Sequence, residues 1–274
     1  MGPGAKPAVP GLLPILADAS APVLLRAKIA EAVAVADPGS PDLSAALVKL
    51  AGDPEVTLRV AAAGAIGKLD PLPPAALSAL VRLAKSDSLN DVRVSALRAL
   101  ALAGKRAAPA RSELTSIAGG TNPWYALWAK VVLAAIDGDV TKAAPAVRAG
   151  LGDKSGVVRA TAADALPLVG GPAAGDLPAL MRLLREPSAA AKEPAARAVG
   201  RLGAGAKEAV PRLGELLTDR DAPVRVAAAD ALGRIGPAAA SAAPKLRVLL
   251  TDPLAGPAAR KALERVQAKD PPKT

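Results

Sequence analysis

The chain of 274 residues contains neither cysteine nor histidine. Without cysteine it can form no disulfide and no thiolate metal site, and it has no cysteine nucleophile. Without histidine it has neither the commonest metal ligand nor the side chain best suited to acid–base chemistry near neutral pH. A Ser–His–Asp triad and a Cys–His pair are therefore excluded. We expect no catalytic residues, no bound metal and no cofactor.

Aromatic residues are also scarce. The chain has no phenylalanine, one tyrosine and two tryptophans, although 51% of its residues are hydrophobic. The core must therefore consist mostly of alanine, leucine and valine, and the first two are among the strongest helix formers. Such small side chains favour a thin core between closely packed helices over a thick globular core.

Long apolar runs are missing as well. The longest stretch without a charge, residues 114–129, has 16 residues and is interrupted by Gly119, Gly120 and Pro123. A membrane-spanning helix needs about 20 apolar residues. The first ten residues contain three prolines and do not form the continuous hydrophobic region of a secretory signal. We therefore expect no membrane insertion and a cytoplasmic location.

The net charge of +10 is spread along the chain, with +3 in residues 1–137 and +7 in residues 138–274. A basic balance can attract nucleic acid or acidic surfaces. However, no run of five like charges occurs, and this dispersed pattern is typical of a solvated surface. We therefore expect binding to nucleic acid less than binding to a protein or peptide.

A short pattern recurs about every 33 residues. Its clearest copy is Pro211, Asp219, Val224 and Arg225. The aspartate recurs in phase at Asp53, Asp87, Asp153 and Asp252. Steps of 33 or 34 residues from Arg225 toward the N-terminus reach Lys192, Arg159, Ala126, Arg93, Arg59 and Arg26. A fixed period of this length indicates an array of stacked helical units.

Each period is predicted to form two helices. Apolar residues at helical spacing mark the first helix, and the recurring proline lies two to three residues inside it. Eleven residues after each arginine position stands a glycine or an aspartate, types that suit the end of the second helix because they tolerate a left-handed backbone. We expect one array over residues 1–268 and a tail at 269–274, with repeats at approximately 6–37, 41–70, 74–104, 108–138, 141–170, 174–203, 207–236 and 240–268.

These residues resemble the HEAT repeat family, particularly its short bacterial kind, which also occurs in phycobilin lyase-like proteins. The match is carried by proline in the first helix, aspartate after it, and Val-Arg at the start of the second helix, as at Val224-Arg225. The resemblance implies an all-α fold, a right-handed α-solenoid of about eight stacked helical hairpins. In the family, the aspartate and arginine form a ladder of hydrogen bonds between neighbouring repeats. The resemblance therefore implies a structural role for Asp53, Asp87, Asp153, Asp219, Arg59, Arg93, Arg159 and Arg225.

The three aromatic residues all lie in one repeat. Trp124, Tyr125 and Trp128 fall within five residues, and the same repeat has Gly120 and Ala126 in place of the ladder aspartate and arginine. Two interpretations remain open. The rings either fill the space of a repeat that stacks differently, or they form an aromatic anchor for a partner. Trp124 is predicted to lie just outside the second helix and to be the most exposed of the three.

In the family the second helices line the concave face. We therefore expect a scaffold that is not an enzyme and that binds a protein or peptide there, as a monomer or as part of a longer chain. The predicted contact residues are Trp124, Leu127, Val60, Val94 and Arg98, together with a basic cluster formed by Arg197, Arg201 and Arg234.

Other members of this superfamily suggest alternatives. One alternative is a nucleic-acid-binding protein similar to the alkylpurine DNA glycosylases, which use tryptophans and a basic cleft. The two tryptophans and the positive net charge of this chain motivate this alternative. A deoxyhypusine hydroxylase would need His–Glu pairs to hold iron, and the chain has no histidine. A lyase-like protein that handles a tetrapyrrole is disfavoured by the small number of aromatic residues.

Overall fold

A computed structural model describes residues 3–268 of the chain. In this range the secondary structure is entirely helical, with α-helices and short 3₁₀ segments and no β-strand. The tail predicted at residues 269–274 lies outside the described residues. The chain divides between Lys142 and Ala143 into two compact units, which we call unit 1 and unit 2. None of the helices within residues 3–268 is long and apolar enough to cross a membrane.

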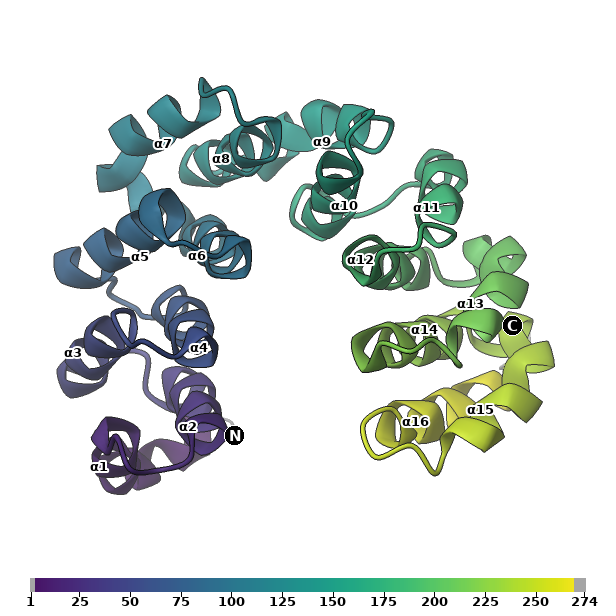
Figure 1. The fold of residues 1–274 in the computed structure, drawn as a ribbon, viewed down its shortest axis with the longest axis horizontal. Helices are drawn as coiled ribbons and strands as arrows, with labels where there is room; N and C mark the ends of the chain where they lie inside the picture. The colour runs from purple at the N-terminus through teal and green to yellow at the C-terminus, as the bar shows by residue number, and fades with distance from the viewer. Residues whose placement is uncertain (1–2, 269–274) are drawn as a thin grey trace, which may run out of the picture. The chain divides into compact units, whose positions relative to one another are not determined.

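Unit 1 contains four helical hairpins in two layers (Figure 1). The first helices form one layer and the second helices form the other. Contacts between neighbouring second helices are more extensive than those between neighbouring first helices, so this unit curves toward its second helices. The hairpins are α1 (Val9–Ala17) with α2 (Val23–Ala36), α3 (Pro41–Leu50) with α4 (Val56–Ile66), α5 (Pro74–Ser86) with α6 (Asn90–Ala103), and α7 (Arg111–Ala118) with α8 (Pro123–Ile136).

Unit 2 repeats the same arrangement with shorter first helices. Within it α10, α12, α14 and α16 pack in sequence against one another. Its hairpins are α9 (Ala144–Gly150) with α10 (Gly156–Ala165), α11 (Leu177–Leu183) with α12 (Ala189–Arg201), α13 (Val210–Leu216) with α14 (Ala222–Ile235), and α15 (Ala243–Leu249) with α16 (Gly256–Val266). Both units are therefore α-solenoids of stacked hairpins, as the sequence predicts.

The recurring proline starts the α-helical part of the first helix. It is the second residue of α1, α9, α11, α13 and α15, at Pro10, Pro145, Pro178, Pro211 and Pro244. Proline has no amide hydrogen, and its ring suits the first turn of a helix. A 3₁₀ segment precedes each of these helices, including η6 (Gly203–Ala209) and η7 (Gly236–Ala242).

The second helices end less uniformly than predicted. Gly104, Gly203 and Gly236 have positive φ of 56°, 56° and 72°, which glycine adopts readily, but ψ of −126° at Gly104 and −143° at Gly236 lies outside the left-handed helical region. Within residues 3–268 no residue other than glycine has positive φ, so the expected left-handed aspartates do not occur. At Asp137 the next residue, Gly138, has the positive φ, at 79°.

Neighbouring second helices approach closely at glycines. A Cβ atom on Gly200 of α12 would lie 2.7 Å from the Cα of Ala231 in α14. A Cβ on Gly67, directly after α4, would lie 2.8 Å from the Cα of Ala99 in α6. No side chain fits at such distances, so these glycines set how tightly the hairpins stack.

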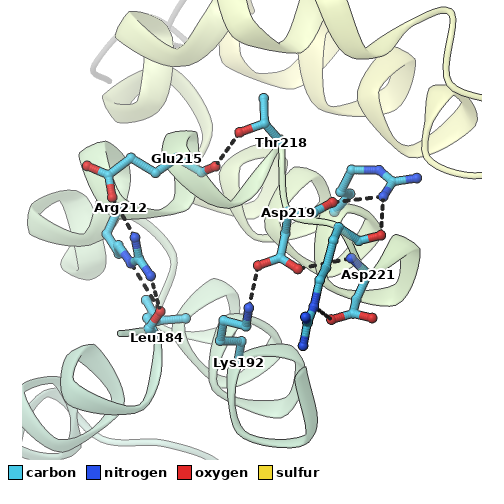
Figure 2. A network of polar contacts seen from close by, with 9 residues as sticks. Leu184, Lys192, Arg212, Glu215, Thr218, Asp219 and Asp221 are labelled. Carbon is cyan, nitrogen blue, oxygen red and sulfur yellow. Dashed lines mark hydrogen bonds and ion pairs between the residues drawn. The ribbon is translucent and has the colours of Figure 1, made fainter. Parts of the chain in front are cut away.

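A ladder of ion pairs joins most successive hairpins within each unit, as the resemblance implies. Of the described residues that the resemblance assigns to this ladder, Arg93 and Asp153 form no such pair: Arg93 donates to the Tyr125 hydroxyl, and the Asp153 carboxylate accepts from the Ser155 amide at 2.7 Å. Each pair links the start of a second helix to the aspartate or glutamate after the next first helix, 27 or 28 residues later. The rungs are Arg26–Asp53 (3.3 Å) and Arg59–Asp87 (2.8 Å) in unit 1, and Arg159–Glu186 (2.6 Å), Lys192–Asp219 and Arg225–Asp252 (2.8 Å) in unit 2. Figure 2 shows the Lys192–Asp219 rung.

The rungs lower the pKa of buried carboxyl groups. Burial alone would raise the pKa of Asp87, but hydrogen bonds from Arg59 and from the Leu89 amide, with the charges of Arg59 and Arg93, lower it by more. The pKa of Asp219 is lowered in the same way against the effect of burial, through Lys192 and the Asp221 amide. These aspartates therefore stay ionised and paired at neutral pH.

Candidate partner-binding surface

The exposed face of the second helices in unit 1 carries apolar side chains from α4 and α6. Val60 of α4 and Val94 of α6 are half-buried. Leu102, near the end of α6, is 57% exposed. Val94, Arg98 and Leu102 follow one another at intervals of four residues and therefore lie along one face of the helix. The sequence prediction included Val60, Val94 and Arg98 but missed Leu102.

Trp124 does not belong to this exposed face, and the prediction of its exposure is wrong. Helix α8 begins at Pro123, so Trp124 lies within the helix and is 8% exposed. Its ring centroid is 3.5 Å from that of Tyr125. Leu127, about one turn further along α8, is 6% exposed and is therefore also buried, although the sequence predicts it as a contact residue. The error arose because Pro123 starts the helix, one residue before the first tryptophan.

Tyr125 supplies the hydrogen-bond acceptor that is missing because Gly120 stands at the position of the ladder aspartate. Arg93 donates a hydrogen bond to the Tyr125 hydroxyl, which in turn donates to the side-chain oxygen of Asn90 at 2.9 Å. The Arg93 guanidinium also lies 4.9 Å from the centre of the tyrosine ring, a cation–π distance. The phenol therefore acts as the acceptor that an aspartate supplies elsewhere, a role that the sequence prediction missed.

Trp128 is the largest fully buried side chain of the described residues. The guanidinium of Arg98 lies 5.9 Å from its ring, and its indole nitrogen has no hydrogen-bond partner. The burial of both tryptophans supports the packing interpretation of the aromatic cluster. It weakens one reason for the nucleic-acid alternative, because buried rings offer little surface for stacking on a base.

The basic cluster predicted in unit 2 is exposed. Arg197 and Arg201 lie one turn apart on α12, and Arg234 lies near the end of α14. A Cβ on Gly200 would lie 3.3 Å from Cδ of Arg234, so this side chain crosses to α12 beside the residue preceding Arg201. Arg197 also forms an ion pair with Glu193 at 2.5 Å, with its own side chain 62% exposed. The structure therefore brings the three predicted arginines onto one surface.

A groove of about 500 Å³ lies on the opposite side of unit 1, along α5 and the segment that leads into α7. Its cations are Arg82, Lys85 and Arg106. Arg82 donates to the carbonyl of Ala51 at 2.9 Å, and Arg106 donates to the carbonyl of Leu69. Two of the three cations are thus engaged with backbone carbonyls, so the groove is a weaker candidate than the second-helix surface.

No cluster of three histidine, cysteine, aspartate or glutamate residues able to hold a metal ion occurs between residues 3 and 268. The second helices of unit 1 instead offer apolar groups on α4 and α6, and those of unit 2 separately offer guanidinium groups on α12 and α14. Such groups can recognise side chains of a partner by burial and by charge.

Comparison with known proteins gives a family match. The family model for HEAT repeats matches residues 9–101 and 177–266, about two thirds of the chain. The unmatched stretch between them includes Gly120 and Ala126, where the ladder residues are lost. No curated protein matches the chain in sequence.

Several solved structures are similar to most or nearly all of the chain. Human deoxyhypusine hydroxylase in complex with glycerol has a TM-score of 0.52 and 20% identity, covering 96% of this chain and 97% of that one. The complex of CpcE and CpcF of phycocyanin lyase from Nostoc sp. PCC7120 has a TM-score of 0.49 and 17% identity, covering 97% and 95%. A designed armadillo repeat protein has a TM-score of 0.40 and 22% identity, covering 80% and 98%.

The likeness to deoxyhypusine hydroxylase contradicts the prediction that this chain is not an enzyme. An enzyme is built on the same fold. At 20% identity the likeness shows the fold alone, so an α-solenoid is no argument against catalysis.

Proposed function

The chain belongs to the HEAT repeat family, and we propose that it binds a protein or peptide partner through the exposed face of its second helices. Within each unit this face is extended, because successive second helices present equivalent positions side by side. Extended surfaces of this kind are what stacked helical repeats use for binding.

The observation that carries the proposal is the row of accessible apolar side chains on α4 and α6. Val60 and Val94 are half-buried, and Leu102 is 57% exposed. A partner that covers Leu102 would gain on the order of 1 kcal/mol from this side chain alone. The row therefore favours a partner with apolar side chains at matching spacing, such as one face of an amphipathic helix.

The arginines of unit 2 add a preference for acidic partners. Arg201 and Arg234 extend the positive surface beyond the Arg197–Glu193 pair. Exposed ion pairs contribute only about 0.2–1 kcal/mol each, so they select a partner and speed its encounter more than they hold it. Binding should therefore weaken moderately, not collapse, as the salt concentration rises.

The proposal is tested by placing a photo-crosslinking amino acid at Leu102 in the full chain. Val248 serves as the matched control, because it is 74% exposed but lies on α15 in the layer of first helices. We expect partners from a native lysate to be captured from position 102 and not from position 248, and Leu102→Asp to weaken binding of the isolated partner. Equal capture from both positions would contradict the proposal.

Nucleic acid remains the alternative occupant of this face. Its remaining support is the exposed cluster of Arg197, Arg201 and Arg234, because both tryptophans are buried. Binding to a random DNA duplex, followed by fluorescence anisotropy at increasing salt, separates the two. Tight binding that falls steeply with salt and is lost in Arg201→Glu/Arg234→Glu would favour nucleic acid. The absence of binding at low salt would eliminate it.

A further inference from the structure

Exposed apolar residues gather on the first hairpin of unit 1. Leu24, Leu25 and Val35 of α2 are 66%, 46% and 42% exposed, and Ile15 of α1 is 37% exposed. In the described part of unit 1, α2 packs against one other second helix, α4, whereas α4 and α6 each lie between two (Figure 1). Leu24, Leu25 and Val35 thus present apolar groups to solvent on the exposed side of α2.

The second helix α16 of unit 2 lacks exposed apolar residues of this kind. From Arg260 to its end, the exposed residues of α16 are Arg260, Lys261, Glu264 and Arg265, which are all charged. The exposed apolar side chains of α2 are therefore a candidate contact for a partner.

The exposed residues of α2 form one narrow stripe. Leu24, Lys28, Glu31 and Val35 are spaced by four, three and four residues, so they follow one face of the helix. Lys28 and Glu31 form an exposed ion pair at 2.8 Å in the middle of the stripe. The stripe is therefore apolar at both ends, with one cation and one anion between them.

The order of these residues makes the stripe complementary to itself. Leu24 and Val35 lie equally far from the midpoint between Lys28 and Glu31. If a second α2 lies antiparallel across this midpoint, Lys28 meets Glu31 of the second copy, and Leu24 meets Val35 of the second copy. Both contacts then occur twice, once on each side of a twofold axis, as an isologous interface requires.

We propose that α2 is a homodimer interface, in which two copies of this chain pair antiparallel through Leu24, Lys28, Glu31 and Val35. The contact involves one stripe of one helix on each copy, whereas a stable interface generally uses about 20–30 residues a side. The dimer is therefore weak, and the chain associates only when it is concentrated.

Charge reversal on α2 tests the register as well as the association. In Lys28→Glu every cross-dimer charge pair becomes Glu–Glu, and in Glu31→Lys every pair becomes Lys–Lys. Sedimentation equilibrium should show at least about tenfold weaker self-association for each single variant. The double variant Lys28→Glu/Glu31→Lys should regain the wild-type affinity, and an equimolar mixture of the two single variants should form heterodimers.

Lys261→Glu provides the matched control, because Lys261 and Glu264 on α16 have the same residue types and the same spacing. It should leave self-association unchanged, and circular dichroism should show that all variants keep their helical content. Leu24→Asp should weaken the dimer as the single charge reversals do. A wild-type chain that stays monomeric up to millimolar concentration would overturn the proposal and leave this face to a different partner. Failure of the double variant to recover would also overturn it.

Discussion

Replacement of Arg59 by methionine is the sharpest test of the ladder between hairpins. Arg59 donates to both carboxylate oxygens of Asp87, at 2.8 and 3.2 Å. It also donates to the backbone carbonyls of Asp53 and Pro54, at 2.9 and 2.8 Å. The side chains of Arg59 and Asp87 are only 12% and 6% exposed. The substitution therefore leaves a buried carboxylate and two carbonyl groups without their donor.

The cost follows from this burial. Removal of one partner from a buried ion pair costs about 3–5 kcal/mol of unfolding free energy, because the remaining charge stays desolvated. Arg111→Met is the control within the same unit, since the Arg111 and Asp137 side chains are 49% and 38% exposed, and such a pair contributes at most about 1 kcal/mol. Addition of Asp87→Asn to Arg59→Met removes the stranded charge and should recover about 1–2 kcal/mol.

Urea unfolding followed by tryptophan fluorescence measures these differences in unit 1, because both tryptophans lie in α8. Circular dichroism follows the helices of the whole chain in the same samples. We expect Arg59→Met to lower the fluorescence midpoint far more than Arg111→Met. Equal losses in the two variants, or no recovery on addition of Asp87→Asn, would show that the rung is not what joins these hairpins.

Three further predictions concern packing and titration. Tyr125→Phe removes the hydroxyl that completes the ladder and should cost about 1–2 kcal/mol in urea unfolding; an unchanged midpoint would refute that role. Gly200→Ala should lower the free energy of unfolding by about 1–3 kcal/mol, because its Cβ meets a backbone atom of the next helix. Gly64→Ala has open space around its Cβ and should raise the free energy of unfolding by about 0.5–1 kcal/mol. Equal signs for the two glycines would contradict the close approach. The lowered pKa values of Asp87 and Asp219 stabilise the fold fully above about pH 4, and this contribution disappears as the pH falls through the native pKa. Urea midpoints measured from pH 7 to pH 2 should therefore fall below pH 4, and the fall should be smaller when both residues are replaced by asparagine.

The hairpins and most rungs of the ladder could be predicted from the sequence because their causes are local and periodic. A proline at a fixed distance from an aspartate positions the start of a first helix, as at Pro211 and Asp219. The constant interval between Arg225 and Asp252 then places one repeat's cation beside the next repeat's carboxylate. Each of these features depends on short spacings along the chain.

The aromatic repeat shows where this reasoning stops. Tyr125 accepts from Arg93 at a separation of 32 residues, whereas the carboxylates lie 27 or 28 residues from their cations. A fixed interval could not identify it, because the long phenol reaches the guanidinium from within the helix. Trp124 was misplaced because the start of the second helix was predicted too late. Helix α8 begins at Pro123, two residues earlier than predicted and at the same repeat position as α14.

Composition and period alone determined that the chain is helical, repetitive and without histidine or cysteine chemistry, because helix propensity and apolar spacing act within a few residues of one another. Only the tertiary structure decided which side chains remain accessible. Leu102 and Leu24 are exposed, while Trp124 and Leu127 are buried, although all four lie on second helices of the same repeat type. Exposure depends on what the neighbouring helices cover, and that coverage is fixed by packing across the array and not by position within one repeat.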